Sequence, residues 1–564
     1  MQPMGGRCVV YLQREKSSSF PMRKVYSLAI ALSLLSLATA QTTTVGVFTN
    51  GESSFDGYTL LAPIPGFETF LINNCGEVVN QWTSDYRVGL SAYLLEDGSL
   101  LRTGQLSSQA DPAFSGGGTG GRVERFSWDG ELVWAIDWAD ETKHHHHDIE
   151  MMPNGNILLI SWESHSYEEA LAMGKNTTNT QNPVWCCSIA EIEPTGSEGG
   201  NVVWYWSAWD HLVQDTDPTK PNYGMISENP RKFNINYTSG QGPNQGAGNS
   251  DWMHCNSVDY NEELDQIVIS SAKFCEFWII DHGLTTEEAA TEAGDLLYRW
   301  GNPRTYDRGT DEDQMMFHQH DSHWMEEGIM VYNNGKNRPE GNYSSVEIIP
   351  TPEMVDGTYP ISETEPFAPV SYSWRYPEIL TSDFYSANIS GATRQPNGNT
   401  LICEGSTGRI FEVTQEEEIV WSYVSPITSF GPTPQGNDPG NNSVFRAYKY
   451  APDYSAFEGR DMTPGSVIEL NPTDWGCSTA GLNQINLEQF LTVYPNPSSG
   501  DFIFEGLQDG ILQLFNTQGA LISEIQINSE SSIRVGETLE TGYYLAIFTS
   551  SITGETVKTR IVKL

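Results

Sequence analysis

Most of the histidines of this chain are concentrated in three short segments. The 564-residue sequence holds 11 histidines, and eight of them fall in the run His144 to His147, the phrase Asp251 to Ser257 and the phrase Phe317 to Trp324. Acidic or amide residues accompany each group, and a strand-like segment follows it. Imidazoles that converge from separate segments could bind a metal, act as general acids and bases, act as nucleophiles, or bind an anion.

The metal alternative has the weakest support among these four. It needs three or four ligands with an open position, yet the sequence contains neither a His-Glu-x-x-His motif nor a Cys-x-x-Cys pair. We therefore expect no metal and no other cofactor. Structural roles are the competing interpretation for part of the set: His144 and His145 as solvated loop residues, His323 as a strand cap, and His254 and His320 as structural histidines.

A weak repeat between about residues 60 and 470 suggests the fold that positions these segments. An apolar and aromatic phrase recurs six times, around Trp82, Trp134, Trp206, Trp300, Trp374 and Trp421. Several copies are followed by turn signals such as Asn154-Gly155 and Asn397-Gly398, which suit a tight two-residue hairpin. Repeated strand–turn–strand units predict an all-β, six-bladed propeller, with a tandem of β-sandwiches as the alternative. Equivalent positions of successive blades face a central channel, where the histidines could meet.

Residues 1–40 have the composition of a signal peptide with a possible upstream extension. Arg23 and Lys24 precede the apolar run Val25 to Leu37, and Ala38-Thr39-Ala40 supplies a small-residue cleavage site. The apolar run is too short to span a bilayer. We expect an exported protein without a transmembrane segment.

Charge and cysteine content narrow the possible partners. Lys and Arg number 30 against 73 Asp and Glu, a formal net charge of -43. Nucleic acids and anionic membranes would be repelled by such a protein. Eight cysteines are scattered along the chain, and Cys8 would leave with the signal peptide. A bridge between Cys255 and Cys275 is possible, but their spacing does not establish it.

The segment from about residue 490 to 564 differs from the rest. Glycine turns separate alternating apolar segments such as Leu512 to Gly519 and Leu539 to Leu545, which predicts a small β-sandwich. These phrases, together with Val493 to Gly500, resemble the C-terminal sorting domain of the type IX secretion system. The resemblance implies that secretion machinery is a partner and that the protein is secreted or held at the outer-membrane surface of a Gram-negative bacterium.

Several phrases, in their order, resemble the arylsulfate sulfotransferase family over about residues 60–465. They are His146 to Glu150, Asp251 to Tyr260, Phe277 to His282, Gly294 to Pro303, and Gln319-His320-Asp321. The resemblance implies that residues 41–480 form a six-bladed propeller. Such an enzyme moves a sulfuryl group from a small aryl sulfate donor to a phenol acceptor through a sulfurylated histidine. It uses neither a metal nor a nucleotide sulfate donor.

The resemblance also assigns site residues. His320 matches the nucleophile, the His254 and Asn256 pair would hold sulfuryl oxygens or the leaving oxygen, and His147 matches a further catalytic histidine, with His146 as a possible substrate-binding neighbour. Ala272 stands where the family has an arginine, and alanine cannot bind an oxyanion. Lys273 and Arg299 are the candidate substrate-binding substitutes. Weak activity, a different acceptor, or a non-catalytic cell-surface propeller that binds aromatic or sulfated ligands therefore remain alternatives.

Overall fold

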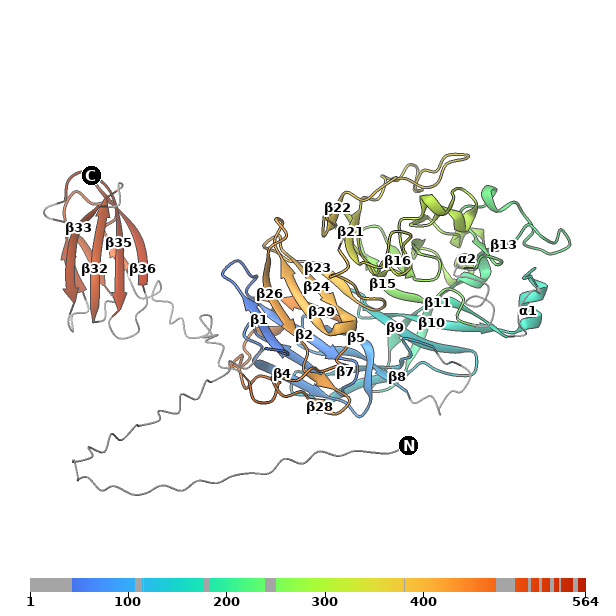
Figure 1. Ribbon diagram of the computed structural model, residues 1–564, viewed down its shortest axis with the longest axis horizontal. Helices are drawn as coiled ribbons and strands as arrows, with labels where there is room; N and C mark the ends of the chain where they lie inside the picture. Colours follow the sequence, from blue (N-terminus) through green and yellow to red (C-terminus); the bar gives the residue numbers. More distant parts are fainter. Residues whose placement is uncertain are drawn as a thin grey trace, which may run out of the picture. The chain divides into compact units, whose positions relative to one another are not determined.

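The computed structural model, shown in Figure 1, describes residues 43–564 with internal gaps. The gaps are residues 107–113, 115, 177–181, 239–249, 380, 473–491, and the short tail segments 506–508, 517–519, 528–531, 537–538 and 551–555. The predicted signal peptide lies outside the described residues. In the described part of the chain, none of the helices is long and apolar enough to cross a membrane.

Six antiparallel sheets account for most of residues 46–450. Four of them are built from consecutive strands. These are β5 (Arg87–Leu94), β6 (Leu100–Gln105), β7 (Gly121–Phe126) and β8 (Leu132–Asp137); β9 (Lys143–Met151), β10 (Ile157–His165), β11 (Val184–Pro194) and β12 (Gly200–Ser207); β15 (Cys255–Asn261), β16 (Gln266–Ser271), β17 (Glu276–Asp281) and β18 (Tyr298–Trp300); and β19 (His320–Met325), β20 (Gly328–Asn333), β21 (Ser345–Ile349) and β22 (Trp374–Tyr376).

The other two sheets join the two ends of this region. In the first blade, β29 (Val444–Tyr450) pairs with β2 (Tyr58–Pro63), which continues into β3 (Glu68–Ile72) and β4 (Val78–Thr83). The sixth blade contains β23 (Gly391–Arg394), β24 (Thr400–Glu404), β25 (Arg409–Val413) and β26 (Ile419–Val424), and β1 (Gly46–Asn50) adds a fifth strand beside β26. Residues near both ends of the region therefore close the ring.

The first strand of each sheet faces the centre of the ring. Each of these strands contacts the next one around the ring. β29 contacts β5, β5 contacts β9, and the series continues through β15, β19 and β23, which contacts β29 again. This closed circuit confirms the six-bladed propeller.

The repeated tryptophans explain how neighbouring blades are attached. Each of the six predicted phrases lies on the fourth strand of a blade. The indole N–H of Trp82 donates to the Ser127 carbonyl of the next blade at 2.9 Å, and that of Trp421 reaches back to the Asn74 carbonyl of the first blade at 2.9 Å. Trp134, Trp204 and Trp300 make the same kind of bond. A buried indole thus packs its apolar ring between two blades, while its N–H donates a hydrogen bond to the neighbouring blade.

The predicted Asn-Gly turns are found, but their geometry differs from the expected two-residue hairpin. Met152 accepts the N–H of Gly155 at 2.9 Å but donates its own N–H to the Asn156 carbonyl at 2.9 Å, and Gln395 does the same with Gly398 and Asn399 at 2.9 and 2.7 Å, so each loop has three residues. Only the glycines have positive φ, 86° and 88°. A proline precedes each Asn-Gly pair and favours the type I turn that this longer loop uses.

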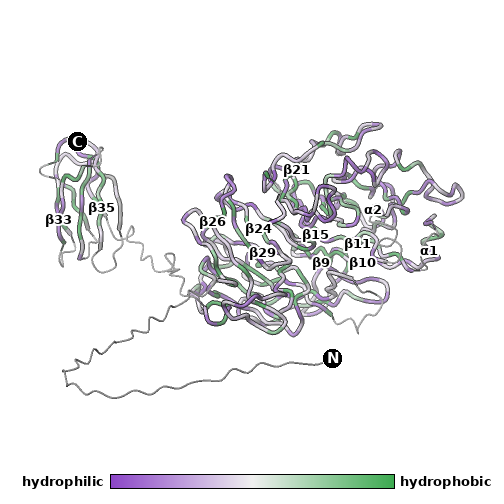
Figure 2. Tube along the Cα trace, in the orientation of Figure 1, coloured by the Kyte–Doolittle hydropathy of each residue, from purple (hydrophilic) through white to green (hydrophobic). Residues whose placement is uncertain are grey.

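Short helices and paired segments decorate the blades. They are α1 (Tyr167–Ala172), α2 (Thr286–Ala289), β13 (Leu212–Val213) with β14 (Phe233–Asn234), and β27 (Ile427–Thr428) with β28 (Gly431–Pro432). Single turns of 3-10 helix lie at Ala208–His211, Ile226–Glu228, Glu292–Gly294, Pro303–Tyr306, Asp311–Asp313, Gly405–Thr407 and Ser455–Phe457. In Figure 2 these peripheral loops are mostly hydrophilic, whereas apolar colour follows the strands.

The C-terminal tail is the predicted small β-sandwich. One sheet contains β30 (Thr492–Tyr494), β31 (Phe502–Glu505) and β34 (Ser532–Val535); the other contains β32 (Gly510–Asn516), β33 (Leu521–Ile527), β35 (Gly542–Ser550) and β36 (Thr556–Lys563). Phe504, Leu514 and Phe548 belong to one buried cluster between them.

Cys255 and Cys275 do not form the disulfide bridge that the sequence allowed. Cys255 and Cys275 are both free and buried. Cys75 is disulfide-bonded, and its partner lies outside the described residues.

Candidate active site

Three histidines from three blades meet beside the channel. His147 lies in β9, His254 directly precedes β15, and His320 begins β19. The ring centroids of His147 and His254 are 4.8 Å apart, and those of His147 and His320 are 6.3 Å apart. The expected convergence of residues distant in sequence is therefore observed.

The backbone around these residues departs from regular strand geometry. His147 and His254 have φ angles of 61° and 52°, and Asp321, which follows the third histidine, has φ 59°. The pairing register also shifts near each of these positions. Left-handed backbone in residues other than glycine is strained and is often found at functional sites. Simple strand alternation therefore does not predict which side chains share this site.

The hydrogen bonds of His320 fix its tautomer. Asn334 donates both side-chain N–H groups, to the carbonyls of Ser386 at 2.8 Å and Ile389 at 2.9 Å. Its Oδ1 therefore accepts, and His320 Nδ1 donates to it at 2.7 Å. His320 Nε2 keeps its lone pair and accepts the Ile389 N–H at 3.2 Å. Asp321 does not orient this ring.

Burial keeps the same imidazole neutral. It lowers the pKa of His320 to about 3, with smaller contributions from His254 and Arg446 and some opposition from Asn334. A neutral ring with an unprotonated Nε2 can act as a nucleophile at physiological pH, once Nε2 gives up the hydrogen bond from the Ile389 N–H.

His254 is paired with a carboxylate. Its Nδ1 forms a very short contact with Asp251 Oδ2. Burial alone would raise the pKa of Asp251, but His254 and then Lys273 outweigh burial and lower it, so Asp251 is ionised. Lys273 Nζ lies 3.7 Å from the same oxygen and also donates to the Asp251 carbonyl. Lys273 therefore lies at the edge of the histidine site, as predicted.

His147 is held between a second histidine and a glycine. Its Nδ1 is 2.7 Å from His146 Nδ1, and His146 stacks on Trp162 at 4.2 Å. A Cβ atom at Gly118 would lie 1.9 Å from Cε1 of His147, so only glycine fits there. Burial lowers the pKa of both histidines well below the ordinary value. His146 therefore contacts both Trp162 and His147 and helps to fix the position of the His147 ring.

The expected solvated positions of His144 and His145 are wrong. Both side chains are buried within β9, which extends through the whole histidine run. His145 Nδ1 accepts the Gly121 N–H at 3.2 Å, and burial lowers its pKa to about 3. His323 contacts the carbonyl of Asp321 at 3.2 Å, and this local bond suits a structural role.

Asn256 positions a neighbouring strand. Its Nδ2 donates to the Gln319 carbonyl at 2.8 Å, directly before His320. The register shift between Cys255 and Ser257 interrupts the strand alternation that would otherwise place Asn256 on the same face as His254. The side chain is fully buried, and its observed bond links β15 to the segment before β19.

Sequence reasoning missed a buried arginine and an apolar wall. Arg446 lies in β29, and its Nη1 is 2.6 Å from Asp148 Oδ2. Four apolar residues form one cluster: Ile64, Leu90, Ile389 and Phe445. Phe445 lies 6.0 Å from the His147 ring, and Ile389 contacts His320 through its N–H. The only sequence signal was a lone arginine inside the apolar run Val444 to Ala447.

The sequence profile of the arylsulfotransferase family matches residues 95–422, more than half of the chain. The chain belongs to this family. A second profile, for a secretion system C-terminal sorting domain, matches residues 492–563. The protein is therefore secreted or located at the outer-membrane surface.

Solved structures add only distant likenesses. A protein of unknown function from Bacteroides caccae is 10% identical, covers 70% of this chain and 99% of its own, and has a TM-score of 0.37. The periplasmic gluconolactonase of Pseudomonas aeruginosa is 10% identical, covers 71% and 99%, and has a TM-score of 0.33. These likenesses carry no argument about function. No curated protein matches the arylsulfotransferase chain.

Arg299 does not join the histidines. Its side chain is completely buried, its Nη2 lies 2.5 Å from Glu276 Oε2, and its remaining donors reach Thr305 and the Lys232 carbonyl. These bonds leave Arg299 a structural role in the fourth blade and correct its expected role in substrate binding.

Ala272 and Lys273 occupy the turn between β16 and β17. Their N–H groups donate to the carbonyls of His254 at 3.1 Å and Met253 at 3.2 Å. The turn explains why Lys273 reaches the site although strand alternation would direct it away. Lys273 thus contacts Asp251 from the position next to Ala272.

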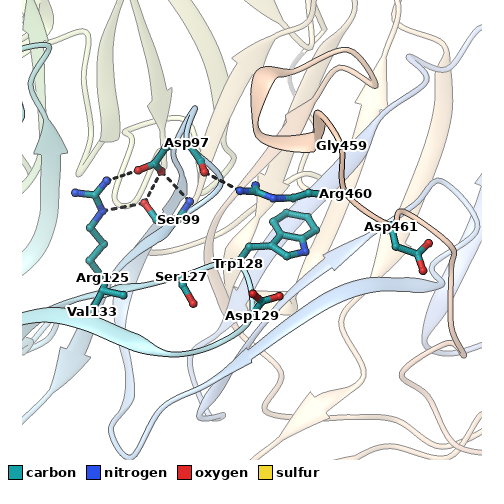
Figure 3. Close-up of a pocket in the computed structure, with 10 residues that line it drawn as sticks. All are labelled: Asp97, Ser99, Arg125, Ser127, Trp128, Asp129, Val133, Gly459, Arg460 and Asp461. Carbon is teal, nitrogen blue, oxygen red and sulfur yellow. Dashed lines mark hydrogen bonds and ion pairs between the residues drawn. The ribbon is translucent and has the colours of Figure 1, made fainter.

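A separate cavity of about 580 Å³ lies between the turn after β5, the turn after β7 and residues 459–461 (Figure 3). Arg125 and Arg460 line it, and both are engaged by Asp97, through its carboxylate and its carbonyl respectively. None of its lining residues belongs to the histidine site. Among the described residues, no group of three or more His, Cys, Asp or Glu is arranged to hold a metal ion.

Proposed function

We propose that this arylsulfotransferase moves a sulfuryl group from an aryl sulfate to a phenol through sulfurylated His320, without a nucleotide sulfate donor. The observation that carries the proposal is the fixed tautomer of His320. Asn334 holds the proton on Nδ1 at 2.7 Å and burial keeps the ring neutral, so Nε2 is unprotonated and can attack sulfur when the Ile389 N–H that it now accepts turns to a sulfuryl oxygen.

In the first half-reaction, His320 Nε2 forms a bond to sulfur while the bond from sulfur to the phenolic oxygen breaks. The leaving oxygen takes a proton from His254, whose imidazolium form is stabilised by Asp251. The products are sulfurylated His320 and a phenol. The Ile389 N–H, 3.2 Å from Nε2, is placed to donate to a sulfuryl oxygen as the new bond forms.

The second half-reaction reverses these steps with a new phenol. Neutral His254 removes the phenolic proton, the phenolic oxygen attacks sulfur, and the bond between sulfur and Nε2 breaks. His320 regains its lone pair and His254 its proton. His147, 4.8 Å from His254 and 6.3 Å from His320, is positioned to contact the sulfuryl oxygens in both steps.

The apolar wall favours an aromatic ring in the donor and acceptor. Ile64, Leu90, Ile389 and Phe445 pack together next to the histidines. Burying an aryl ring against such side chains contributes binding energy, whereas a sugar or an alkyl polyol would lose hydrogen bonds to water there.

The substitution at Ala272 supports a second candidate, a non-catalytic propeller that binds aromatic or sulfated ligands. Loss of one oxyanion donor commonly costs on the order of 100-fold in rate. Lys273 lies 3.7 Å from Asp251, the carboxylate that contacts His254, and this cation beside the site favours the catalytic proposal over the second candidate.

A chromogenic aryl sulfate, assayed with and without added phenol, tests the proposal. Phenol-stimulated release of the aryl alcohol, together with a sulfuryl adduct on the His320 peptide after incubation with donor alone, is the expected result. Release that does not respond to phenol would indicate a hydrolytic sulfatase. Ligand binding without release or adduct would favour the binding protein.

A further inference from the structure

Arg446 lies where inner strands from several blades meet. From β29, its Nη1 donates to Asp148 Oδ2 at 2.6 Å and to the Tyr93 hydroxyl at 3.3 Å, and its Nη2 donates to the Asn256 carbonyl at 2.9 Å. Its Nε lies 3.0 Å from Asp321 Oδ1. The side chain is only 5% exposed. One guanidinium therefore contacts β5, β9, β15 and β19.

The two carboxylates extend this network. Asp148 Oδ2 also accepts the Val258 N–H of β15 at 3.2 Å, and Asp321 Oδ2 accepts the Ala392 N–H of β23 at 2.9 Å. With β29 itself, the inner strands of all six blades are joined through Arg446 and its two partners.

Each anchor adjoins one of the three histidines in sequence. Asp148 follows His147, Asp321 follows His320, and Asn256 lies two residues after His254. The backbone at these points is left-handed or irregular, so it needs support from outside the strand. We propose that Arg446 is the positioning residue that sets the mutual orientation of the three imidazoles.

The same cation also acts on the charge state of the imidazoles. After burial, the largest cause, Arg446 is among the groups that lower the pKa of His320 and of His147. The other titratable groups that act on these rings are His146 and His254. The guanidinium is faced by Asp148, Asp321, Glu150, Tyr93 and Tyr448. Removal of Arg446 should therefore raise the pKa of both imidazoles, since it deletes a cation and leaves the carboxylates unbalanced.

Three variants separate positioning from general stabilisation. Arg446→Gln removes the cation, Arg446→Lys keeps the charge without the branched reach, and Arg299→Gln is the matched control. Arg299 is equally buried and paired with Glu276, but it lies away from the histidines. Folding is checked by circular dichroism before each measurement.

The first measurement is an NMR titration of the His320 and His147 rings, which requires no catalysis. In Arg446→Gln the His320 ring should titrate about one pH unit higher or more, with a smaller shift in Arg446→Lys and none in Arg299→Gln. An unchanged titration and unchanged ring shifts in folded Arg446→Gln would overturn the inference.

The second measurement rests on the proposed function and follows adduct formation on His320 with an aryl sulfate. Arg446→Gln should slow it by about 100-fold, because small misplacements of reacting groups have effects of that size. Partial rescue is expected in Arg446→Lys, and a wild-type rate in Arg446→Gln would count against positioning. If wild type forms no adduct, the proposed function fails, while the titration still decides the role of Arg446.

A charge-balanced double variant covers the case in which Arg446→Gln does not fold. Arg446→Gln with Asp148→Asn removes one cation and one anion together, so it leaves less uncompensated charge in the interior. It retains Asp321 but loses the link between β9 and β19. The same changes in ring shifts are expected, and wild-type ring shifts in this folded variant would overturn the inference.

Discussion

Five blades carry a left-handed residue near the channel, but two kinds of side chain surround these points. Leu90 in β5 and Ile389 before β23 have φ angles of 117° and 53°, while His147, His254 and Asp321 have 61°, 52° and 59°. The histidine half of the ring comprises β9, β15 and β19. The apolar half comprises β5, β23 and β29, the last of which carries Phe445.

This division shows that the propeller repeats a left-handed backbone position in successive blades, and that the side chains at and around each position determine its role. Neutral imidazoles and the ionised carboxylate of Asp251 gather in one half, where charge develops in the proposed reaction. The other half carries the packed cluster of Leu90, Ile389 and Phe445, in which Phe445 is fully buried and Leu90 and Ile389 are 7% and 8% exposed. Arg446 lies in β29 of the apolar half and contacts Asp148 and Asp321 of the histidine half.

The largest effect is expected from deletion of the proposed nucleophile. His320→Ala should reduce transfer by about 10⁴-fold or more and abolish the sulfuryl adduct, because the variant lacks the nitrogen proposed to attack sulfur. Mass spectrometry of the peptide that contains residue 320 measures the adduct. His165→Ala, outside the three histidine groups, is a control. An adduct of wild-type amount in His320→Ala would place the nucleophile elsewhere.

Acid should destabilise the propeller through its histidine half. Burial holds the pKa of His145 and His320 at about 3 and that of His318 at about 4, below the ordinary value of 6.5. The unfolded chain therefore binds more protons below pH 6.5, and the stability contributed by these groups is lost as pH falls from 6.5 toward 3 to 4. Each fully buried ring contributes up to about 1.4 kcal/mol per pH unit.

Two carboxylates work in the opposite direction. Burial raises the pKa of Glu150 and brings that of Asp259 to about 6, so their protonation favours the folded state at low pH. Asp210, Asp307, Glu404 and Glu469 also have a raised pKa, but by smaller shifts. The five rings with a lowered pKa begin to lose stability at pH 6.5, where these four carboxylates are still ionised, so a net loss is expected between pH 7.5 and 5.0. Urea unfolding at pH 7.5 and 5.0, followed by tryptophan fluorescence, tests this because all tryptophans precede residue 490. Equal midpoints at the two pH values would contradict the expectation.

Truncation of the apolar wall should alter binding more than chemistry. Phe445→Ala should raise KM for an aryl sulfate by about 10-fold, since roughly 1.5 to 3 kcal/mol accompanies full burial of such a side chain. The rate of adduct formation at saturating donor should change much less. Steady-state kinetics with a small and a bulky aryl donor give the comparison. Phe445→Leu is the conservative control. If Phe445→Ala lowers kcat and leaves KM unchanged, the apolar wall is not part of the binding site.

The sequence predicted features that depend on local chemistry. The tryptophan phrases and Asn-Gly turns mark strands and hairpins wherever they occur, and the propeller then brings His147, His254 and His320 together. Arg446 and Asn334 could not be assigned, because their roles depend on contacts across several blades. A register shift interrupts strand alternation at Asn256, and Lys273 lies in the turn between β16 and β17, so alternation does not predict where either side chain lies.

The burial of polar residues was the other source of error. The histidine run was expected in a solvated loop because imidazoles are polar, yet β9 extends through it and the rings pack beside Phe114 and Trp162. Arg299 was expected in the channel because it is a cation near the family motif. Its partner Glu276 lies on the adjacent strand and holds it inside the blade.

The smallest expected effect is a gain of activity at the position that departs from the family. Ala272→Arg should raise turnover by a few-fold, because a guanidinium beside His254 would add an oxyanion donor to the histidine half. The gain should fall short of the roughly 100-fold attributed to such donors, since Lys273 already lies 3.7 Å from Asp251. Ala272→Met is the control for size without charge, and equal stimulation by both variants would exclude an electrostatic cause. In a Lys273→Met background the gain from Ala272→Arg should be larger. If the gain is instead unchanged, Lys273 is not the cation that substitutes for the arginine.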